Sequence, residues 1–374
     1  MRDVCVTYEP DGSYYATGSF WGVEQYRRDV VLFRSRDKLH WEPLPPVYTA
    51  TQFREIPGFD VAKLDEFLSK DDGKNREFKI QIGENHVQRV GDTYYILPMQ
   101  FSGLGGNMLI KSLSGKIEGP YRGIRDLPST ADLSVDDDGT LLLQWGDKIT
   151  SFKNTAELET LPRKEFAVRS HVIEAPRNIC FSEDCEVGVM RIAGKYVNWS
   201  TDWTGSYDAI YHWADSLQGP WQGALRILPY GGNGRFFRDG DGTWWYAYFM
   251  NTNDYTTRAQ NYCRMNMYPL FVGVENGELI IEPKAVRENR AALEKMGAMW
   301  QVTRIGQTSS ISAAACLATR SPPPSMRASS ATARTDSTGN STTAKSVTRP
   351  RNPKGTIPSM TAARHSRSRR NARR

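Results

Sequence analysis

Three carboxylates in the 374-residue chain stand at similar distances before a turn that contains glycine. They are Asp3, Asp132 and Glu186, which precede Gly12, Gly139 and Gly194 by 9, 7 and 8 residues. Carboxylates gathered around one pocket suit cleavage of a glycosidic bond. One can activate water as general base, one can protonate the leaving group as general acid, and a third can tune that acid. The elements around these residues decide whether the fold brings them together.

Each of these turns belongs to a pattern that occurs five times, a turn glycine followed by an apolar or aromatic strand. Glycine adopts a positive φ without steric cost, so such turns favour hairpins. The turn glycines are Gly12, Gly91, Gly139, Gly194 and Gly242, with separations of 79, 48, 55 and 48 residues. A period near 50 with several short strands in each unit is typical of a β-propeller.

A second element follows three of these turns in the same order. It has a Ser-rich start and a turn or Pro break beside an aromatic residue, in the segments Ser35–Leu44, Ser112–Gly123 and Ser216–Gly223. The repeated order predicts an all-β fold, a five-bladed β-propeller, over residues 1–300. A twisted β-sandwich with similar hairpins is the alternative.

The first interval is long because it holds an insertion, Thr49–Asn85. Within it, Val61, Leu64 and Leu68 have helical spacing, which predicts a short helix on a loop. A second helix is expected within Lys284–Trp300. Because the innermost strands of a propeller face one axis, we expect Asp132 there. The neighbouring Asp136–Asp138 run is interpreted as a turn.

The composition changes abruptly after Trp300, and residues 301–374 are treated as a separate low-complexity basic tail. From Thr303 the chain has 14 basic residues, one acid and no Phe, Trp or Tyr, which leaves 34 basic and 41 acidic residues before it. Such a tail cannot bury enough apolar surface to fold. A shifted reading frame, a disordered tail and a basic arm for an anionic partner are the open interpretations. The acidic front portion gives no reason to expect nucleic acid.

Other classes of protein are not favoured. No apolar run is long enough to predict a membrane span, and no signal peptide is visible. We therefore expect the chain either to be cytoplasmic or to begin downstream of a true start. The five cysteines fit neither a disulfide framework nor a zinc site and are expected to be free thiols. No resident metal is predicted from the residues, because the VDDDG turn lacks the ligand spacing of a calcium loop.

The ordered motifs resemble glycoside hydrolase family 43 over about residues 1–285. The resemblance is carried by RDVCVTYEPDGSYYATGS, SRDKLHW, ADLSVDDDGTLLLQWG, CEVGVMRIAGKYV with SLQGPW, and GGNGRFFRDGDGTWWYAYF. It implies an inverting hydrolase of O-glycosyl bonds in arabinose-, xylose- or galactose-containing glycans. By the same resemblance Asp3 is the base, Asp132 positions substrate and tunes the acid, and Glu186 is the acid.

Two departures from the family pattern affect these roles. The acid motif usually reads Glu-Gly-Pro, whereas this chain has Glu186 in EVG, and Glu174 in EAP is a second choice for the acid. Asn233 stands where relatives carry a His that faces the axis, often beside a bound calcium. No cofactor is therefore required, and the absence of the imidazole argues against a central calcium.

Aromatic residues at the ends of inner strands are candidates for stacking on a sugar or for packing. These are Phe20, Trp21 and Trp203, and we group them with Asn233 as candidate substrate-binding residues. The expected partner is an oligosaccharide or polysaccharide bound by a monomer, with no nucleic acid and no membrane. The family is often secreted or periplasmic, but the sequence does not fix the location.

Two other functions remain open. A catalytically inactive propeller that binds carbohydrate is the main alternative. A retaining fructan-active enzyme ranks below it, because its Asn-Asp-Pro-type nucleophile motif is absent.

Overall fold

The structure is a computed structural model. The structure describes residues 1–20, 24–75, 77–100, 104, 106–128, 131–172, 187–202, 207–249 and 265–295. The tail from 301 onward, and with it the choice among its three interpretations, lies outside the described residues. Within the described part of the chain, no helix is both long and apolar enough to span a membrane.

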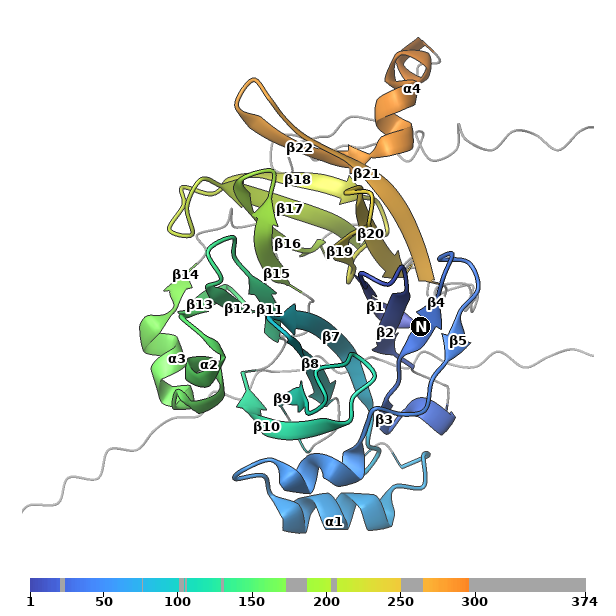
Figure 1. The fold of residues 1–374 in the computed structure, drawn as a ribbon, viewed down its shortest axis with the longest axis vertical. Helices are drawn as coiled ribbons and strands as arrows, with labels where there is room; N and C mark the ends of the chain where they lie inside the picture. The colour runs from blue at the N-terminus through green and yellow to red at the C-terminus, as the bar shows by residue number, and fades with distance from the viewer. Residues whose placement is uncertain are drawn as a thin grey trace, which may run out of the picture. The chain divides into compact units, whose positions relative to one another are not determined.

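Five four-stranded antiparallel sheets form the blades of a β-propeller, as predicted (Figure 1). Blade 1 contains β1 (Arg2–Tyr8), β2 (Tyr14–Ser19), β4 (Phe33–Ser35) and β5 (Glu42–Pro43). Blade 2 contains β7 (Ile82–Val90), β8 (Thr93–Gln100), β9 (Asn107–Ser112) and β10 (Tyr121–Leu127). Blade 3 contains β11 (Ala131–Val135), β12 (Leu141–Trp145), β13 (Lys148–Phe152) and β14 (His171–Val172).

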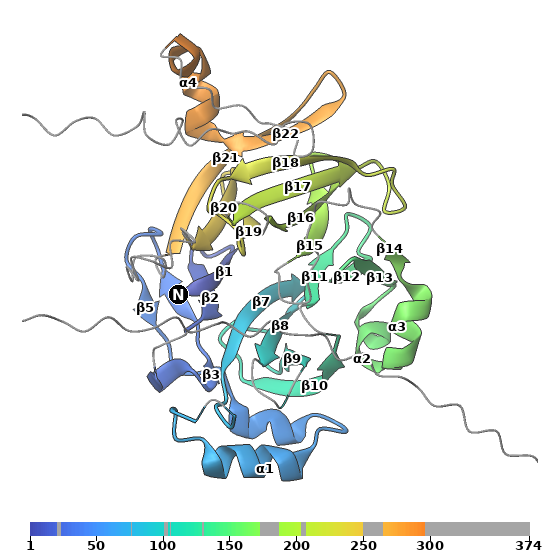
Figure 2. The same cartoon turned by 180° about the vertical axis from the view of Figure 1, so that it is seen from behind.

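The last two blades follow the same meander. Blade 4 contains β15 (Gly188–Ile192), β16 (Lys195–Asp202), β17 (Asp208–Ala214) and β18 (Gln222–Leu228). Blade 5 contains β19 (Arg235–Arg238), β20 (Trp244–Phe249), β21 (Met265–Glu275) and β22 (Glu278–Pro283). In both views the first strand of each blade lies nearest the centre, so residues at the starts of β1, β7, β11, β15 and β19 converge (Figures 1 and 2).

The five predicted turn glycines each lie between the first and second strands of a blade. All have a positive φ, between 58° and 86°. The three Ser-initiated segments fall at the connections between the third and fourth strands of blades 1, 2 and 4. The repeats in the sequence therefore mark the same two turns of successive blades.

Helices occur outside the blades, as expected for the insertion and the C-terminal segment. The insertion forms η2 (Ala50–Glu55) and α1 (Val61–Lys70) beside blade 2, after a two-stranded sheet of β3 (Asp29–Val30) and β6 (Tyr48–Thr49) (Figure 1). Blade 3 carries α2 (Thr155–Thr160) and α3 (Arg163–Arg169), η1 (Glu24–Tyr26) follows β2, and α4 (Lys284–Lys295) follows β22. The insertion ends earlier than predicted, because β7 begins at Ile82.

Apolar residues fill the spaces between neighbouring blades. Among the described residues, one buried cluster joins each adjacent pair, and the insertion adds Leu64 and Phe67 to the cluster between blades 1 and 2. Blades 1 and 5 are each built from one continuous region of the chain, so the ring closes through side chains rather than a shared strand. Tyr14 of blade 1 donates a hydrogen bond to Asp239 after β19 at 2.5 Å, and Lys38 forms an ion pair with the same carboxylate.

Candidate active site

Asp3 lies at a distortion near the start of β1. The pairing of β1 with β2 shifts register between Arg2 and Cys5, and Asp3 has a φ of 52° and is 1% exposed. A Cβ on Gly18 of β2 would lie 2.2 Å from the Arg2 carbonyl oxygen and 2.7 Å from that of Asp3. The glycine therefore allows the close approach that this left-handed backbone requires.

The side chain of Asn233 fixes one oxygen of Asp3. Asn233 Nδ2 donates a hydrogen bond to Asp3 Oδ1 at 3.1 Å. Its own Oδ1 accepts from Thr201 Oγ1 at 2.9 Å, and its backbone N–H donates to the same hydroxyl at 2.8 Å. Asn233 thus connects blade 4 to the carboxylate of blade 1, just before blade 5 begins.

The second oxygen of Asp3 is left for another partner. Asp3 Oδ2 is buried and accepts no hydrogen bond within the part of the chain that the structure describes. The carboxylate also forms no ion pair with the described cations. Burying a carboxylate oxygen without a hydrogen-bond donor costs free energy, so we expect water or a ligand hydroxyl to donate to this atom.

Asp132 lies in β11, as predicted, and its surroundings differ from those of Asp3. It is 2% exposed and lies between two groups from other blades. Arg235 Nη2 lies 2.7 Å from Asp132 Oδ1, and His86 Nδ1 lies 3.2 Å from the same oxygen. The Arg235 contact is close enough for an ion pair, although its angles do not meet those of a hydrogen bond.

Arg235 holds several parts of the axis together. It starts β19 of blade 5, yet its Nη2 donates to the Leu133 carbonyl of blade 3 at 2.9 Å. Its Nη1 lies 3.8 Å from the Sγ of Cys5 in blade 1. Blade 4 adds Gly188, where a Cβ would meet Asp132 Oδ2 at 2.3 Å and the ring of Trp199 at 2.0 Å. Residues of all five blades therefore surround the two aspartates.

Glu84 is an axial acid that the sequence reasoning missed. It lies where β7 shifts register between Gly83 and His86, has a φ of 45° and is buried. Its backbone N–H donates to Ser19 Oγ at 2.9 Å, which joins it to the strand beside Asp3. The distortion repeats that of Asp3 one blade further on. Glu84 precedes Gly91 by seven residues, so the spacing rule used for the other carboxylates would have found it.

The remaining predicted site residues divide into two groups. Phe20 is 5% exposed and stacks on Phe33 with ring centroids 5.4 Å apart, so its burial favours the packing role. The others, Trp21, Glu174, Glu186 and Trp203, lie outside the described residues.

The described residues at the axis do not form a metal site. No three His, Cys, Asp or Glu side chains converge to hold an ion within that part of the chain. Cys5 is a buried free thiol. The other four cysteines lie outside the described ranges.

Comparison with known proteins gives a likeness in structure only. No protein-family model matches the sequence, and no curated protein matches it. The structure is similar to a bifunctional GH43-CE protein from Bacteroides eggerthii, with a TM-score of 0.52 and 17% identity over 76% of this chain. It is similar to an exo-beta-1,3-galactanase from Clostridium thermocellum, with a TM-score of 0.51 and 12% identity over 76% of the chain.

An exo-1,5-alpha-L-arabinanase from a bovine ruminal metagenomic library matches equally well, with a TM-score of 0.51 and 13% identity over 75% of the chain. The aligned region spans 34% of the first of these proteins, 61% of the second and 96% of the third. At these identities the likeness is one of fold. The chain has the five-bladed β-propeller fold of glycoside hydrolase family 43 enzymes.

Proposed function

We propose that this protein is a glycoside hydrolase that cleaves arabinoside, xyloside or galactoside bonds in glycans with inversion at the anomeric carbon. Its structural neighbours include a galactanase and an arabinanase. The observation that carries the proposal is the pair of buried aspartates at the axis, one of which keeps an oxygen without a donor among the described residues. No metal or cofactor takes part in the proposed reaction.

Asp3 is the proposed general base. A base must accept a proton from water, so one oxygen has to be able to accept a hydrogen bond from that water while the carboxylate stays oriented. Asn233 holds Oδ1, and Oδ2 accepts no bond from the described residues. The same asparagine stands where relatives carry a His, and here its amide supplies the orienting donor.

Asp132 is proposed to position substrate and to tune the acid rather than to transfer a proton. Arg235 Nη2 lies 2.7 Å from its Oδ1, so this carboxylate is engaged by an ion pair and not by a water molecule. The acid is expected from the segment that leads into β15. Glu186, directly before Val187, is the first choice and Glu174 the second.

The experiment that tests the proposal is a turnover assay on nitrophenyl arabinofuranoside, xyloside and galactoside, followed by NMR of the first anomer formed. Asp3→Asn is expected to lower kcat by about 10²–10⁴-fold, and Glu186→Gln to do the same on substrates with a poor leaving group. Asp11→Asn is the matched control, because Asp11 is exposed at the opposite end of β1 and β2.

Three outcomes would contradict parts of the proposal. Normal turnover by Asp3→Asn would remove Asp3 as base, and a retained anomer would exclude single displacement. Loss of turnover in Glu174→Gln but not in Glu186→Gln would assign the role of general acid to Glu174. Sugar binding without turnover by the unchanged protein would favour an inactive carbohydrate-binding propeller.

A further inference from the structure

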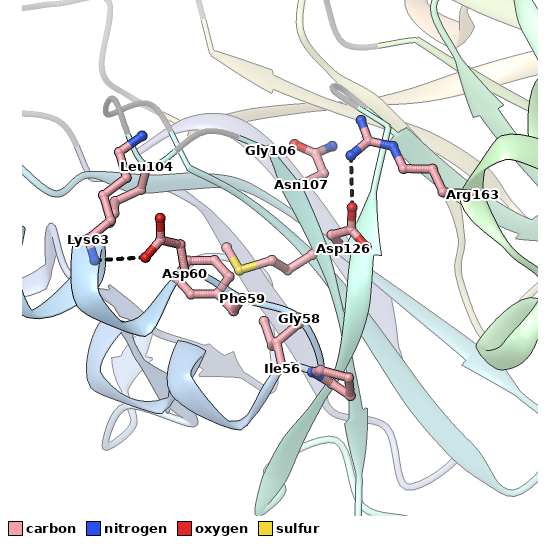
Figure 3. A pocket seen from close by; sticks show the side chains of 12 residues that line it. Ile56, Gly58, Phe59, Asp60, Lys63, Leu104, Gly106, Asn107, Asp126 and Arg163 are labelled. Carbon is pink, nitrogen blue, oxygen red and sulfur yellow. Dashed lines mark hydrogen bonds and ion pairs between the residues drawn. The ribbon is translucent and has the colours of Figure 1, made fainter.

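A hollow lies at the outer part of blade 2, and neither Asp3 nor Asp132 lines it. It has a volume of about 450 Å³, within the range of small-molecule sites. Phe59 and Asp60 from the helical insertion lie on one side, and Asp126 of β10 and Arg163 of α3 lie on the other (Figure 3). Asn107, the first residue of β9, also lines it.

The pairing of strands places this hollow on the same edge of the propeller as Asp3. In blade 2, Ile82 pairs with Gln100, Met99 with Asn107, and Asn107 with Leu127, so these residues lie along one edge of the sheet. Glu84 near that edge bonds to Ser19, which pairs with Arg2 beside Asp3. With about 4.8 Å between strands, the third and fourth strands lie roughly 10–15 Å outward from β7.

The walls of the hollow are held in place by packing. Gly123 of β10 lets Ile56 approach so closely that a Cβ there would lie 2.5 Å from Ile56 Cγ1. The Phe59 ring packs on buried Phe53, with centroids 5.7 Å apart. Asp60 accepts a hydrogen bond from the Lys63 backbone N–H at 2.9 Å. The site is therefore preorganised rather than a gap between loose segments.

The chemistry of the lining fits a neutral ligand with many hydroxyl groups. Two acids and two bases line it, and the Asp126–Arg163 pair is closed at 2.8 Å, so no net charge remains to attract an anion. The carboxylates accept hydrogen bonds and the cations donate them. The half-buried Phe59 adds apolar surface for the C–H face of a sugar.

We propose that this hollow is a distal subsite that binds an oligosaccharide chain whose reacting end lies at the axis. The inference takes the class of ligand from the proposed function, but the location comes from the strand register and the lining. It follows that the protein prefers substrates long enough to extend outward over blade 2.

The test compares Arg163→Gln and Phe59→Ala with Arg122→Gln. Arg163 and Arg122 are both exposed, but Arg122 lies at the opposite end of β10 and does not line the hollow. Because loss of a charge-assisted hydrogen bond costs about one factor of ten, Arg163→Gln should lower kcat/KM about tenfold on arabino-, xylo- or galacto-oligosaccharides. The same variant should change kcat/KM on the nitrophenyl glycoside less than twofold, and Arg122→Gln should match the unchanged protein on both substrates.

Binding measured in the Asp3→Asn background separates this inference from the proposed function. If no substrate is cleaved, calorimetry with the same oligosaccharides still tests the hollow, and a tenfold weaker affinity in Arg163→Gln supports it. Three results would overturn the subsite. The variants could affect long and short substrates equally, or both Arg163→Gln and Phe59→Ala could bind oligosaccharides with unchanged affinity. The third is that the Asp3→Asn protein, with its hollow intact, binds no oligosaccharide.

Discussion

Arg235 of blade 5 lies 2.7 Å from Asp132 of blade 3, so this ion pair joins two blades that are not neighbours in the ring. Both side chains are at least 95% buried. Two charges placed in such an interior compensate each other, and removing one leaves the other without its partner. The pair is therefore expected to matter for the integrity of the axis as well as for the proposed chemistry.

Replacement of Arg235 by Gln should lower the free energy of unfolding by about 3–5 kcal/mol, because it removes the ion-pair partner of the buried Asp132 side chain. Urea denaturation at neutral pH measures this change. Arg238→Gln is the matched control on the same strand, since Arg238 is exposed and its contacts, a hydrogen bond to the Gly242 carbonyl and a position over the Trp244 ring, are local. Similar stabilities of the two variants would show that the axial pair contributes no more than a surface arginine.

The closure between blades 1 and 5 gives a prediction that depends on pH. Burial alone would raise the pKa of Asp239, but hydrogen bonds from Lys38 and Tyr14 outweigh it and lower the pKa. A lowered carboxyl pKa stabilises the fold above the unfolded value near 3.9, and this contribution is lost as the pH falls through the folded value. Asp239→Asn should cost about 2 kcal/mol at pH 7 and progressively less below pH 4.

Asp241→Asn is the control for this closure, because Asp241 is exposed in the same turn and its bond to the Thr243 N–H can be kept by Asn. Thermal unfolding from pH 7 to pH 2 follows both variants. A constant difference between Asp239→Asn and the unchanged protein over that range would contradict the assignment of the pH effect to this carboxylate.

The buried carboxylate of Asp71 links the helical insertion to the segment that precedes β3. Asp71 forms ion pairs with Arg27 and with Arg28, the latter at 2.9 Å, and it accepts from the Ile80 backbone N–H at 3.0 Å. Asp71→Asn should therefore loosen α1 locally by about 3 kcal/mol. Hydrogen exchange measured by mass spectrometry should rise in residues 61–70 and stay unchanged in the blades.

Asp65→Asn is the control for the insertion, because Asp65 is an exposed residue of the same helix. Equal protection of α1 from hydrogen exchange in the two variants would show that Asp71 does not stabilise this helix. Loosening of α1 should also weaken the proposed distal subsite, which Asp60 and Phe59 line.

The repeats in the sequence were sufficient to predict the propeller and to place Asp3 and Asp132 at the starts of inner strands. Turn glycines favour the same hairpin geometry in each blade, so the spacing between them gives the length of each repeating unit. Glu84 was missed because the insertion was taken to extend to Asn85. Only the pairing of Ile82 with Gln100 shows that this stretch belongs to a blade.

The contacts across the axis could not be predicted in the same way. Arg235 meets Asp132 because five first strands converge, and nothing in the local sequence of either residue specifies the other. The role of Asn233 also needed the structure. Its departure from the family pattern was visible, but its bonds to Asp3 and Thr201 depend on the left-handed backbone that points the amide inward.

A buried histidine in blade 4 should make stability fall in mildly acidic solution. His212 of β17 is fully buried, with Nδ1 against the Gly223 carbonyl, and burial lowers its pKa to about 4. Between pH 6.5 and 4 the unfolded chain binds a proton at this residue and the folded chain does not, so stability decreases as the pH falls. The loss over that range should be about 3 kcal/mol.

His212→Gln should remove this component of the pH dependence, so its unfolding free energy should change less between pH 6.5 and 4 than that of the unchanged protein. Exposed His40 provides the contrast, because hydrogen bonding to Asp37 raises its pKa. Protonated His40 therefore stabilises the fold at low pH, and its replacement should make the unfolding free energy fall more steeply as the pH decreases. Chemical denaturation at half-unit pH intervals distinguishes the two. A pH profile of His212→Gln parallel to that of the unchanged protein would mean that His212 is protonated in the fold or has access to water.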